Sequence, residues 1–401
     1  MYFDLKDQAR MELQLAKINN YHQQVEKIYL IGHRGMGVSN ILQQPEHSSL
    51  VFLENTIASF KEAIILGADG IELDVFSSKD RHVMVIHSDE LRMHIYNNRG
   101  DEELLIQESS KTFIVGNKTY NQLKKLVVGP QGELIPTLSE ILALVTEANL
   151  IRTKLGLPHL ILNIELKNSN FSEQAINWVV EDTIKLICKY LKEHSDNLLL
   201  LENIYFCSFN HQALQYLLTI ADSLQVKEKI RFAASVTSIS LFGEDNIDGD
   251  YRLLDRTIKY LDEELSTLKT LFITEPGFIA YDAVIWNIYR PFIELINARS
   301  KQLHISAPNY RLDEVSKEFC IFLLKISNKI SQIYFKCDAV EQSRQVLLDK
   351  SEKLQKYLLR REKLAQQLIL PTLEQQSSSD FNSQLLNSQE VLGSCLKRPR
   401  I

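Results

Sequence analysis

The sequence has few cysteines and no recognisable signal peptide, so it lacks the usual features of a secreted protein or of one stabilised by a structural metal ion. Five cysteines are scattered along the chain at positions 188, 207, 320, 337 and 395, and no two of them form a Cys-x-x-Cys pair. An odd, scattered set argues against a disulfide framework or a zinc site and favours a reducing compartment. The segment from Met1 to Lys6 lacks the basic and apolar regions of a signal peptide.

Long apolar runs and an excess of basic side chains are also missing. No run approaches the roughly 20 apolar residues that cross a bilayer, so we expect no transmembrane segment. A net charge of −6 gives no electrostatic case for a nucleic-acid partner. The one basic cluster, Lys397–Arg400, is interpreted as a solvated tail end. We expect a cytoplasmic protein, or one exported by a route without a cleavable signal peptide.

From residue 28 onward, apolar runs of strand length alternate with longer amphipathic segments. The runs are Ile28–Ile31, Gly70–Val75, Val83–His87, Leu160–Leu166, Ile204–Ser208, Ile230–Ala234, Leu271–Thr274, Leu303–Ser306 and Ile333–Lys336. Thr56–Leu66 and Phe171–Leu191 are typical of the helices between them, and Thr137 with Glu140 predicts a capping box. Alternation of strands and helices favours an α/β fold with a parallel sheet.

The remaining segments suggest additions to one central domain. We expect a helical extension over residues 1–27, a main domain over 28–338 with an acidic insertion at 237–270, and a helix over 339–372. The leucine stripe of that last helix is more often packed on the protein's own core, and a partner contact through it is the alternative. Residues 373–401 are rich in Gln, Ser and Asn over most of their length and predict a disordered tail.

Two carboxylates share one face of a predicted strand. In Gly70–Val75, Glu72 and Asp74 point away from the apolar face and lie about 7 Å apart along the strand. Buried like charges are costly unless something neutralises them, and a hard divalent cation with oxygen ligands does so. The same alternation places Glu165 as a third carboxylate and Lys167 as a cation for an anionic substrate. The alternative is that Glu165 and Lys167 are strand-end residues that pair with each other or with solvent.

Two histidines follow predicted strands. His33 and Arg34 come after Ile28–Ile31, and His87 comes after Val83–Ile86. Histidine titrates near neutral pH, so two of them can serve as base and acid in one hydrolysis, while Arg34 offers a planar donor fork to phosphate. Because barrel enzymes assemble their sites at the carboxyl ends of strands, the convergence of these residues predicts one catalytic site.

At these residues the chain resembles the glycerophosphodiester phosphodiesterase family. The matching segments are His33–Gly35, Glu54-Asn55-Thr56, Ser59-Phe60, Gly67–Val75, Lys79-Asp80 with His87, Ile135–Glu140, Ile164–Lys167 and Ser208-Phe209. The resemblance covers residues 28–210. It departs after His87, where Ser88 replaces the usual Asp. A late Trp-Thr-Val-Asn strand is matched at best by residues 334–337, and the closing Gly-x-Asp-Gly-Ile strand is not recognisable.

The resemblance implies a TIM (β/α)8 barrel, possibly irregular in its last strands, and metal-dependent hydrolysis of a glycerophosphodiester to an alcohol and glycerol 3-phosphate. It implies His33 and His87 as general base and acid in an order left open, and one Mg²⁺ or Ca²⁺ ion. The ion would be held by Glu72, Asp74 and Glu165. Arg34 and Lys167 would contact the phosphate. Glu54 would support the site residues without contacting the substrate itself.

Three readings of the function follow from this. The first is a glycerophosphodiesterase, or a relative that cleaves lysophospholipids as a lysophospholipase D. The second is another two-histidine barrel enzyme that cleaves phosphoinositides or sphingolipids. The third is a catalytically inactive barrel serving as a binding module, with the C-terminal helix recruiting a partner. The complete acid–base and carboxylate set argues against the third, and Glu165 favours the first over the second.

Overall fold

The chain forms a parallel β-barrel, and the described helices pack on its outer face. This computed structural model describes residues 1–36, 52–87, 114–126, 128, 132–167, 173–194, 198–237, 271–274, 302–306, 323–324, 327, 332–337, 339–352 and 356. It divides into two compact units, Met1–Lys350 and Ser351–Ile401, and the barrel belongs to the first. In the second unit, residues 351, 352 and 356 are described, and they are helical.

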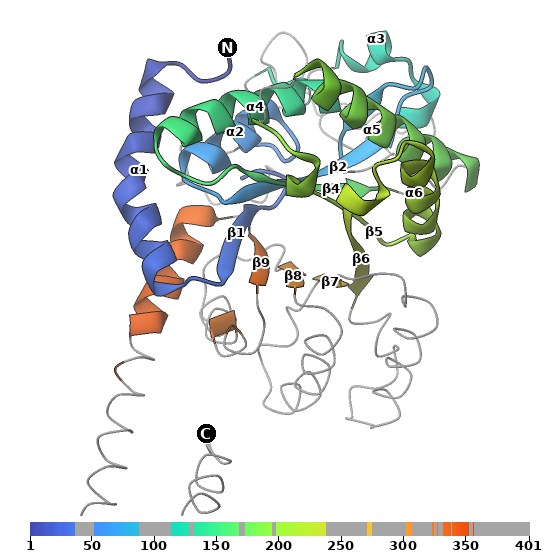
Figure 1. Ribbon diagram of the computed structural model, residues 1–401. Helices are drawn as coiled ribbons and strands as arrows, with labels where there is room; N and C mark the ends of the chain where they lie inside the picture. Colours follow the sequence, from blue (N-terminus) through green and yellow to red (C-terminus); the bar gives the residue numbers. More distant parts are fainter. Residues whose placement is uncertain are drawn as a thin grey trace, which may run out of the picture. The chain divides into compact units, whose positions relative to one another are not determined.

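Eight parallel strands close into a ring (Figure 1). The barrel strands are β1 (Ile28–Gly32), β2 (Gly70–Ser77), β4 (Ile161–Leu166), β5 (Ile204–Ser208), β6 (Arg231–Thr237), β7 (Leu271–Thr274), β8 (Gln302–Ser306) and β9 (Gln332–Cys337). Each pairs in parallel with its neighbours, and β1 pairs with both β2 and β9, which closes the sheet. The predicted TIM (β/α)8 barrel is confirmed.

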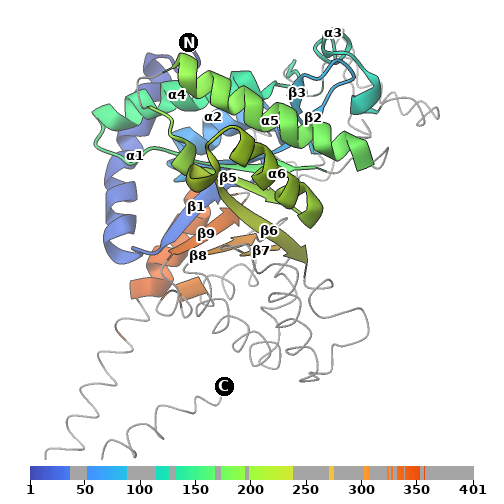
Figure 2. The same cartoon turned by 45° about the vertical axis from the view of Figure 1, so that its right-hand side comes forward.

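Within the part of the chain that the structure describes, helices lie between several of the successive strands. They are α1 (Leu5–Gln24), α2 (Ile57–Ile65), α3 (Tyr120–Leu123), α4 (Leu138–Lys154), α5 (Glu173–Glu193) and α6 (His211–Ser223). Helices α2, α5 and α6 pack against the outside of the barrel at β1, β2, β4, β5 and β6 (Figures 1 and 2). The predicted capping box of Thr137 and Glu140 opens α4, and Thr56 caps α2. Among the described residues, no helix combines the length and the apolar character that a membrane crossing requires.

One predicted strand does not belong to the barrel. The run Val83–His87 was expected to alternate with helices like the other runs, but only Val83–Val85 form a strand, β3, and it lies antiparallel to β2. Residues 78–82 turn the chain back on itself, so β2 and β3 form a hairpin and no helix separates them. The assumption that His87 follows a barrel strand is therefore wrong, because β3 runs back alongside β2.

The last barrel strand is β9, and it occupies the position that the sequence left without a recognisable segment. Residues 334–337 were matched to a different late strand of the family, but they lie in the strand that pairs with β1 and closes the barrel. The helix that follows starts at residue 340, and its Arg344 donates hydrogen bonds to the carbonyls of Leu66 and Gly67 after α2. The expected insertion at 237–270, except for Thr237 at the end of β6, and the expected tail at 373–401 lie outside the described residues.

Aromatic and aliphatic side chains fill the amino-terminal half of the barrel interior. This barrel floor consists of Tyr29, Ile31, Ile161, Tyr205 and Tyr334. The hydroxyls of Tyr205 and Tyr334 lie 3.2 Å apart, and the rings of Tyr29 and Tyr334 stack with centroids 5.3 Å apart. Because interior positions recur every second residue, the same strands present different side chains one layer higher.

Candidate functional site

Charged side chains replace the aromatic ones at the carboxyl end of the barrel. The site cluster consists of His33, Arg34, Glu54, Glu72, Asp74, His87, Glu165, Lys167 and Lys336, which are joined through the contacts described below. Strand β2 supplies Glu72 and Asp74, and the register sets Asp74 directly beside Glu165 of β4. The loops and strand ends that carry the other members converge on these carboxylates.

Three carboxylates meet inside the barrel. Glu72, Asp74 and Glu165 are all buried, and one oxygen of each lies within 4.8 Å of the others. Oδ1 of Asp74 is fully buried and has no hydrogen-bond partner, although the Nζ of Lys167 lies 3.4 Å away. A buried carboxylate oxygen without a donor is an uncompensated acceptor, so the donor set fits a hard divalent cation.

Glu72 uses both of its carboxylate oxygens within the protein. Oε1 accepts a hydrogen bond from Nζ of Lys336 at 2.8 Å, and Oε2 accepts one from the backbone N–H of Arg34 at 3.0 Å. Burial opposes ionisation, but the Lys336 ammonium outweighs it and the pKa of Glu72 is lowered. The same pair raises the pKa of Lys336 despite its burial, so both partners are charged at neutral pH.

Asp74 lies among cations and an amide. Nδ2 of Asn55 donates to Oδ2 at 2.8 Å, and the backbone N–H of Asp74 donates back to Oδ1 of Asn55 at 3.3 Å. Nε of Arg34 lies 3.5 Å from Oδ2. Against the cost of burial, Lys167 and Arg34 lower the pKa of Asp74 far below its usual range. This aspartate is therefore ionised at any pH at which the protein works.

Lys167 bridges two of the carboxylates from the open side of the cluster. Its Nζ donates to Oε1 of Glu165 at 2.7 Å and lies 3.4 Å from Oδ1 of Asp74. Its side chain is 17% exposed, against 2% for Lys336. Burial alone would lower the pKa of Lys167, but Asp74 and Glu165 raise it, so the ammonium stays charged.

The loop after β1 places a guanidinium beside the carboxylates. Arg34 has a φ of 49° and Gly35 a φ of 85°, and a Cβ on Gly35 would collide with Ser59. Oγ of Ser59 donates to the Arg34 carbonyl at 2.9 Å, which fixes this tight turn against α2. Nη1 of Arg34 then donates to Oε2 of Glu54 at 2.6 Å. Glycine is required here because only it can follow the turn so close to another backbone.

The two histidines reach the cluster by different routes. The backbone N–H of His33, at the end of β1, donates to the Cys337 carbonyl of β9 at 3.0 Å, and the side chain of His33 helps to lower the pKa of Glu72. His87 follows β3, and the bond from the Ile86 N–H to the Asp74 carbonyl holds that segment level with the carboxylates. Nδ1 of His87 lies 3.8 Å from Oε1 of Glu54, and its side chain is 36% exposed. Burial, helped by Arg34 and Lys167, lowers the pKa of His87.

The structure brings all eight residues singled out from the sequence into one cluster, and their catalytic and binding roles stay predictions. Sequence reasoning missed Lys336, the buried partner of Glu72. Its signal was present, because Tyr334 and Lys336 alternate with Ile333 and Phe335 as Glu72 and Asp74 alternate with their apolar neighbours. Ser88, which interrupts the family motif after His87, lies outside the described residues.

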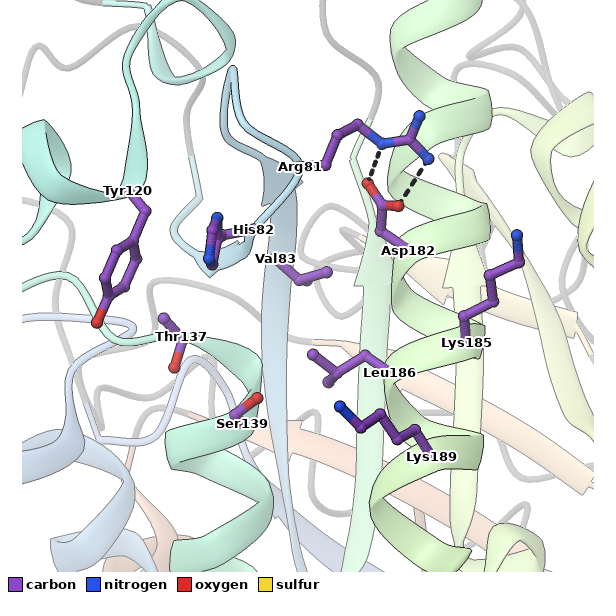
Figure 3. Close-up of a pocket in the computed structure, with 10 residues that line it drawn as sticks. All are labelled: Arg81, His82, Val83, Tyr120, Thr137, Ser139, Asp182, Lys185, Leu186 and Lys189. Atoms are coloured by element: carbon purple, nitrogen blue, oxygen red, sulfur yellow. Dashed lines mark hydrogen bonds and ion pairs between the residues drawn. The ribbon is translucent and has the colours of Figure 1, made fainter.

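A separate pocket of about 530 Å³ lies outside the barrel, between the β2–β3 hairpin and helices α3, α4 and α5 (Figure 3). Arg81 at the hairpin turn donates to both oxygens of Asp182 on α5. The ring of His82 stacks on Tyr120 with centroids 4.7 Å apart. None of the residues that line this pocket belongs to the site cluster. The contacts of Arg81 and His82 around it attach the β2–β3 hairpin to α5 and α3.

Comparison with known proteins agrees with the geometry. Residues 33–239 match the family model described as "Glycerophosphoryl diester phosphodiesterase family". A glycerophosphodiester phosphodiesterase of Caldanaerobacter subterraneus is 34% identical over 179 residues, which are 43% of this chain and 59% of that protein. A protein of the same name from Bacillus altitudinis is 32% identical over 138 residues, 33% of this chain and 47% of that protein. The chain thus spans about half the length of the curated relatives it matches.

The fold agrees with a solved structure as well. A protein from Silicibacter pomeroyi, with 14% sequence identity, superimposes with a TM-score of 0.53 over 80% of this chain and 94% of that one. At this identity the likeness concerns the fold alone. The family model covers more than half of the 401 residues and begins at His33, the first histidine of the site cluster. The chain belongs to the glycerophosphoryl diester phosphodiesterase family.

Proposed function

We propose that the protein hydrolyses a glycerophosphodiester to an alcohol and glycerol 3-phosphate, with the aid of one divalent cation. The observation that carries this proposal is the site cluster itself. Three buried carboxylates, two histidines, an arginine and a lysine meet at the carboxyl end of a barrel whose family is named for this reaction. The relatives named above are the source of the substrate class.

Glu72, Asp74 and Glu165 would hold the cation, Mg²⁺ or Ca²⁺. Oδ1 of Asp74 has no hydrogen-bond partner to displace, and Glu165 contributes an oxygen beside it. When bound, such an ion neutralises phosphate oxygens and stabilises the charge that develops during displacement. Arg34 and Lys167 are 15% and 17% exposed, so their cationic ends would contact the same phosphate from the open side.

The histidines would move the protons. Hydrolysis requires that the oxygen of a water molecule attacks phosphorus while the bond from phosphorus to the oxygen of the leaving alcohol breaks. The lowered pKa of His87 keeps its ring neutral at pH 7, so it would accept a proton from the attacking water. His33 would then give a proton to the oxygen of the leaving alcohol. Glu54, between Arg34 and His87, would orient both side chains.

A substrate panel tests the proposal. Purified full-length protein is incubated with glycerophosphocholine, glycerophosphoethanolamine or lysophosphatidylcholine, each with Mg²⁺, with Ca²⁺ and with EDTA. We expect release of glycerol 3-phosphate and the free alcohol from the first two substrates, abolished by EDTA and restored by excess cation. Cleavage of lysophosphatidylcholine alone would support the lysophospholipase reading instead.

Single-residue variants test the assigned residues. His33→Ala should remove hydrolysis, and His159→Ala, a histidine exchange outside the site cluster, should leave it unchanged. Circular dichroism and thermal unfolding are used to check that both variants are folded. If no diester is cleaved with either cation, the enzymatic function is rejected. Activity that persists in His33→Ala would reject the two-histidine mechanism.

A further inference from the structure

A buried lysine lies where the cation would bind, and it has no part in the proposed reaction. Lys336 of β9 is 2% exposed, and its Nζ donates to Oε1 of Glu72 at 2.8 Å. The other oxygen of Glu72 is held by the Arg34 backbone at 3.0 Å. Of the three carboxylates that could hold a cation, Glu72 is the one whose two oxygens both accept hydrogen bonds that are fixed by the barrel.

The strand register places Lys336 on the floor side of the carboxylates. Ile31 of β1 pairs with both Gly70 and Lys336, so the backbone of Lys336 lies level with Gly70, two residues below Glu72. The lysine side chain therefore reaches Glu72 from the barrel floor. Lys167 and Arg34 lie on the open side, and they are 17% and 15% exposed. The two lysines thus bracket the carboxylates from opposite ends.

The position of Lys336 beside Glu72 makes the binding of a divalent cation less favourable. A buried ammonium and a divalent ion at the same carboxylate repel each other, and this repulsion is strong in a poorly solvated site. The cation must therefore share Glu72 with a charge that it cannot displace into water. Among the described residues of the site cluster, four carboxylates face three permanent cations. Without Lys336, two more negative charges than positive ones would remain.

We propose that Lys336 is a positioning residue that holds Oε1 of Glu72 and thereby weakens the binding of the divalent cation at the carboxylates, leaving the loaded site positive enough to attract a phosphodiester monoanion. The inference rests on the proposed function. With one divalent ion bound, the four carboxylates, the three permanent cations and the ion sum to one positive charge, which one phosphodiester balances. Without Lys336 the cation would bind more tightly and the substrate anion less tightly.

Binding of Mg²⁺ alone, measured by isothermal titration calorimetry on substrate-free full-length protein, tests the proposal. We expect Lys336→Met and Lys336→Gln to bind Mg²⁺ on the order of tenfold more tightly than the unchanged protein. Lys336→Arg keeps the charge and can fork across both oxygens of Glu72, so it should bind Mg²⁺ no more tightly than the unchanged protein. Lys124→Met removes the partner of Glu140 outside the cluster and is the matched control, with Mg²⁺ affinity unchanged.

Kinetics give a second readout. In the two neutral variants the KM for glycerophosphocholine should rise several-fold, more than kcat falls, because the loaded site has lost a positive charge. Neutral variants that are folded but bind Mg²⁺ equally or less tightly would overturn the proposal. If neither neutral variant folds, Lys336→Arg decides, and tighter Mg²⁺ binding by this variant overturns the proposal.

The outcomes separate this inference from the proposed function. If the unchanged protein binds Mg²⁺ and cleaves the diester while the lysine variants keep its affinity, only the role of Lys336 is wrong. If the unchanged protein cleaves no diester, the proposed function fails, and the role of Lys336 is rejected with it.

Discussion

The barrel floor and the site cluster are built by the same strands, yet they differ in every physical property. Strand β9 gives Tyr334 to the floor and, two residues later, Lys336 to the cluster, while β4 gives Ile161 and then Glu165. The floor is aromatic and aliphatic, and the hydroxyls of Tyr205 and Tyr334 lie within hydrogen-bond distance of each other, and of Arg231 and Gln332 respectively. The cluster holds four carboxylates close together and balances them with cations. The change takes place between Tyr334 and Lys336 on β9 and between Ile161 and Glu165 on β4, so stability and chemistry are separated along the barrel axis.

The sharpest test of this separation is a change confined to the cluster. His87→Ala should lower kcat by about 10²- to 10⁴-fold, because the general base is lost. The temperature of unfolding should change little, since the side chain is 36% exposed and outside the barrel floor. Choline release from glycerophosphocholine and differential scanning calorimetry give the two numbers. A large loss of stability with a modest loss of turnover would show that the two regions are not separate.

The reverse change lies in the floor. Tyr334→Ala should reduce the free energy of unfolding by about 3–5 kcal/mol, because a buried aromatic ring leaves a cavity. It also removes the contacts with Tyr29 and Tyr205. The folded fraction should keep the kcat of the unchanged protein at low temperature. Denaturant titration and turnover per folded molecule measure the two effects. Tyr334→Phe should lower the free energy of unfolding by less and should likewise leave kcat unchanged.

The pH dependence of kcat/KM tests the electrostatic difference between the site cluster and the barrel floor. Burial, with Arg34 and Lys167, lowers the pKa of His87 below its ordinary value of 6.5, so the ring stays neutral until the pH falls below that value. The acid limb of kcat/KM should therefore lie below pH 6.5, and activity should be lost as His87 is protonated. A profile from pH 4.5 to 8 locates the limb. An acid limb above pH 7 would contradict the assignment of His87 as base.

The smallest effect is expected at the hairpin that carries His87. Arg81→Ala removes the ion pairs with Asp182 and Glu181, which are partly exposed and contribute about 0.2–1 kcal/mol each. We expect kcat to fall only a few-fold and the Mg²⁺ affinity to remain unchanged, because the carboxylates lie on the barrel strands. The matched control is Lys185→Ala, which removes only the neighbouring pair with Glu181. A loss of Mg²⁺ binding in Arg81→Ala would contradict this division.

The fold was largely predictable because its determinants are local. The apolar runs found in the sequence correspond to the strands, and the capping box of Thr137 with Glu140 opens α4 as expected. The antiparallel course of β3 was not predictable from periodicity, because a short apolar run looks the same in a barrel strand and in a hairpin. What decides between them is whether a helix fits between the runs, and residues 78–82 are too few.

The site was predictable where it depends on alternation within one strand. Glu72 and Asp74 stand out because they interrupt an apolar strand at its interior positions, and Glu165 does so in β4. The pairing of Lys336 with Glu72 was not accessible, since 264 positions separate the two residues and only barrel closure brings them together. Asn55, which holds Asp74, was seen as part of a motif, but its hydrogen bonds depend on the turn after β1.

The antiparallel hairpin has a consequence for how this site can vary between proteins. Because side chains alternate along a strand, one residue added to or removed from the turn at 78–82 would shift the register of β3 by one and turn His87 to the opposite face. The barrel itself would be untouched by such an insertion. A change of two residues would restore the orientation. Insertions and deletions at this turn should therefore be accepted in even numbers where hydrolysis is preserved, and in odd numbers only where it has been lost.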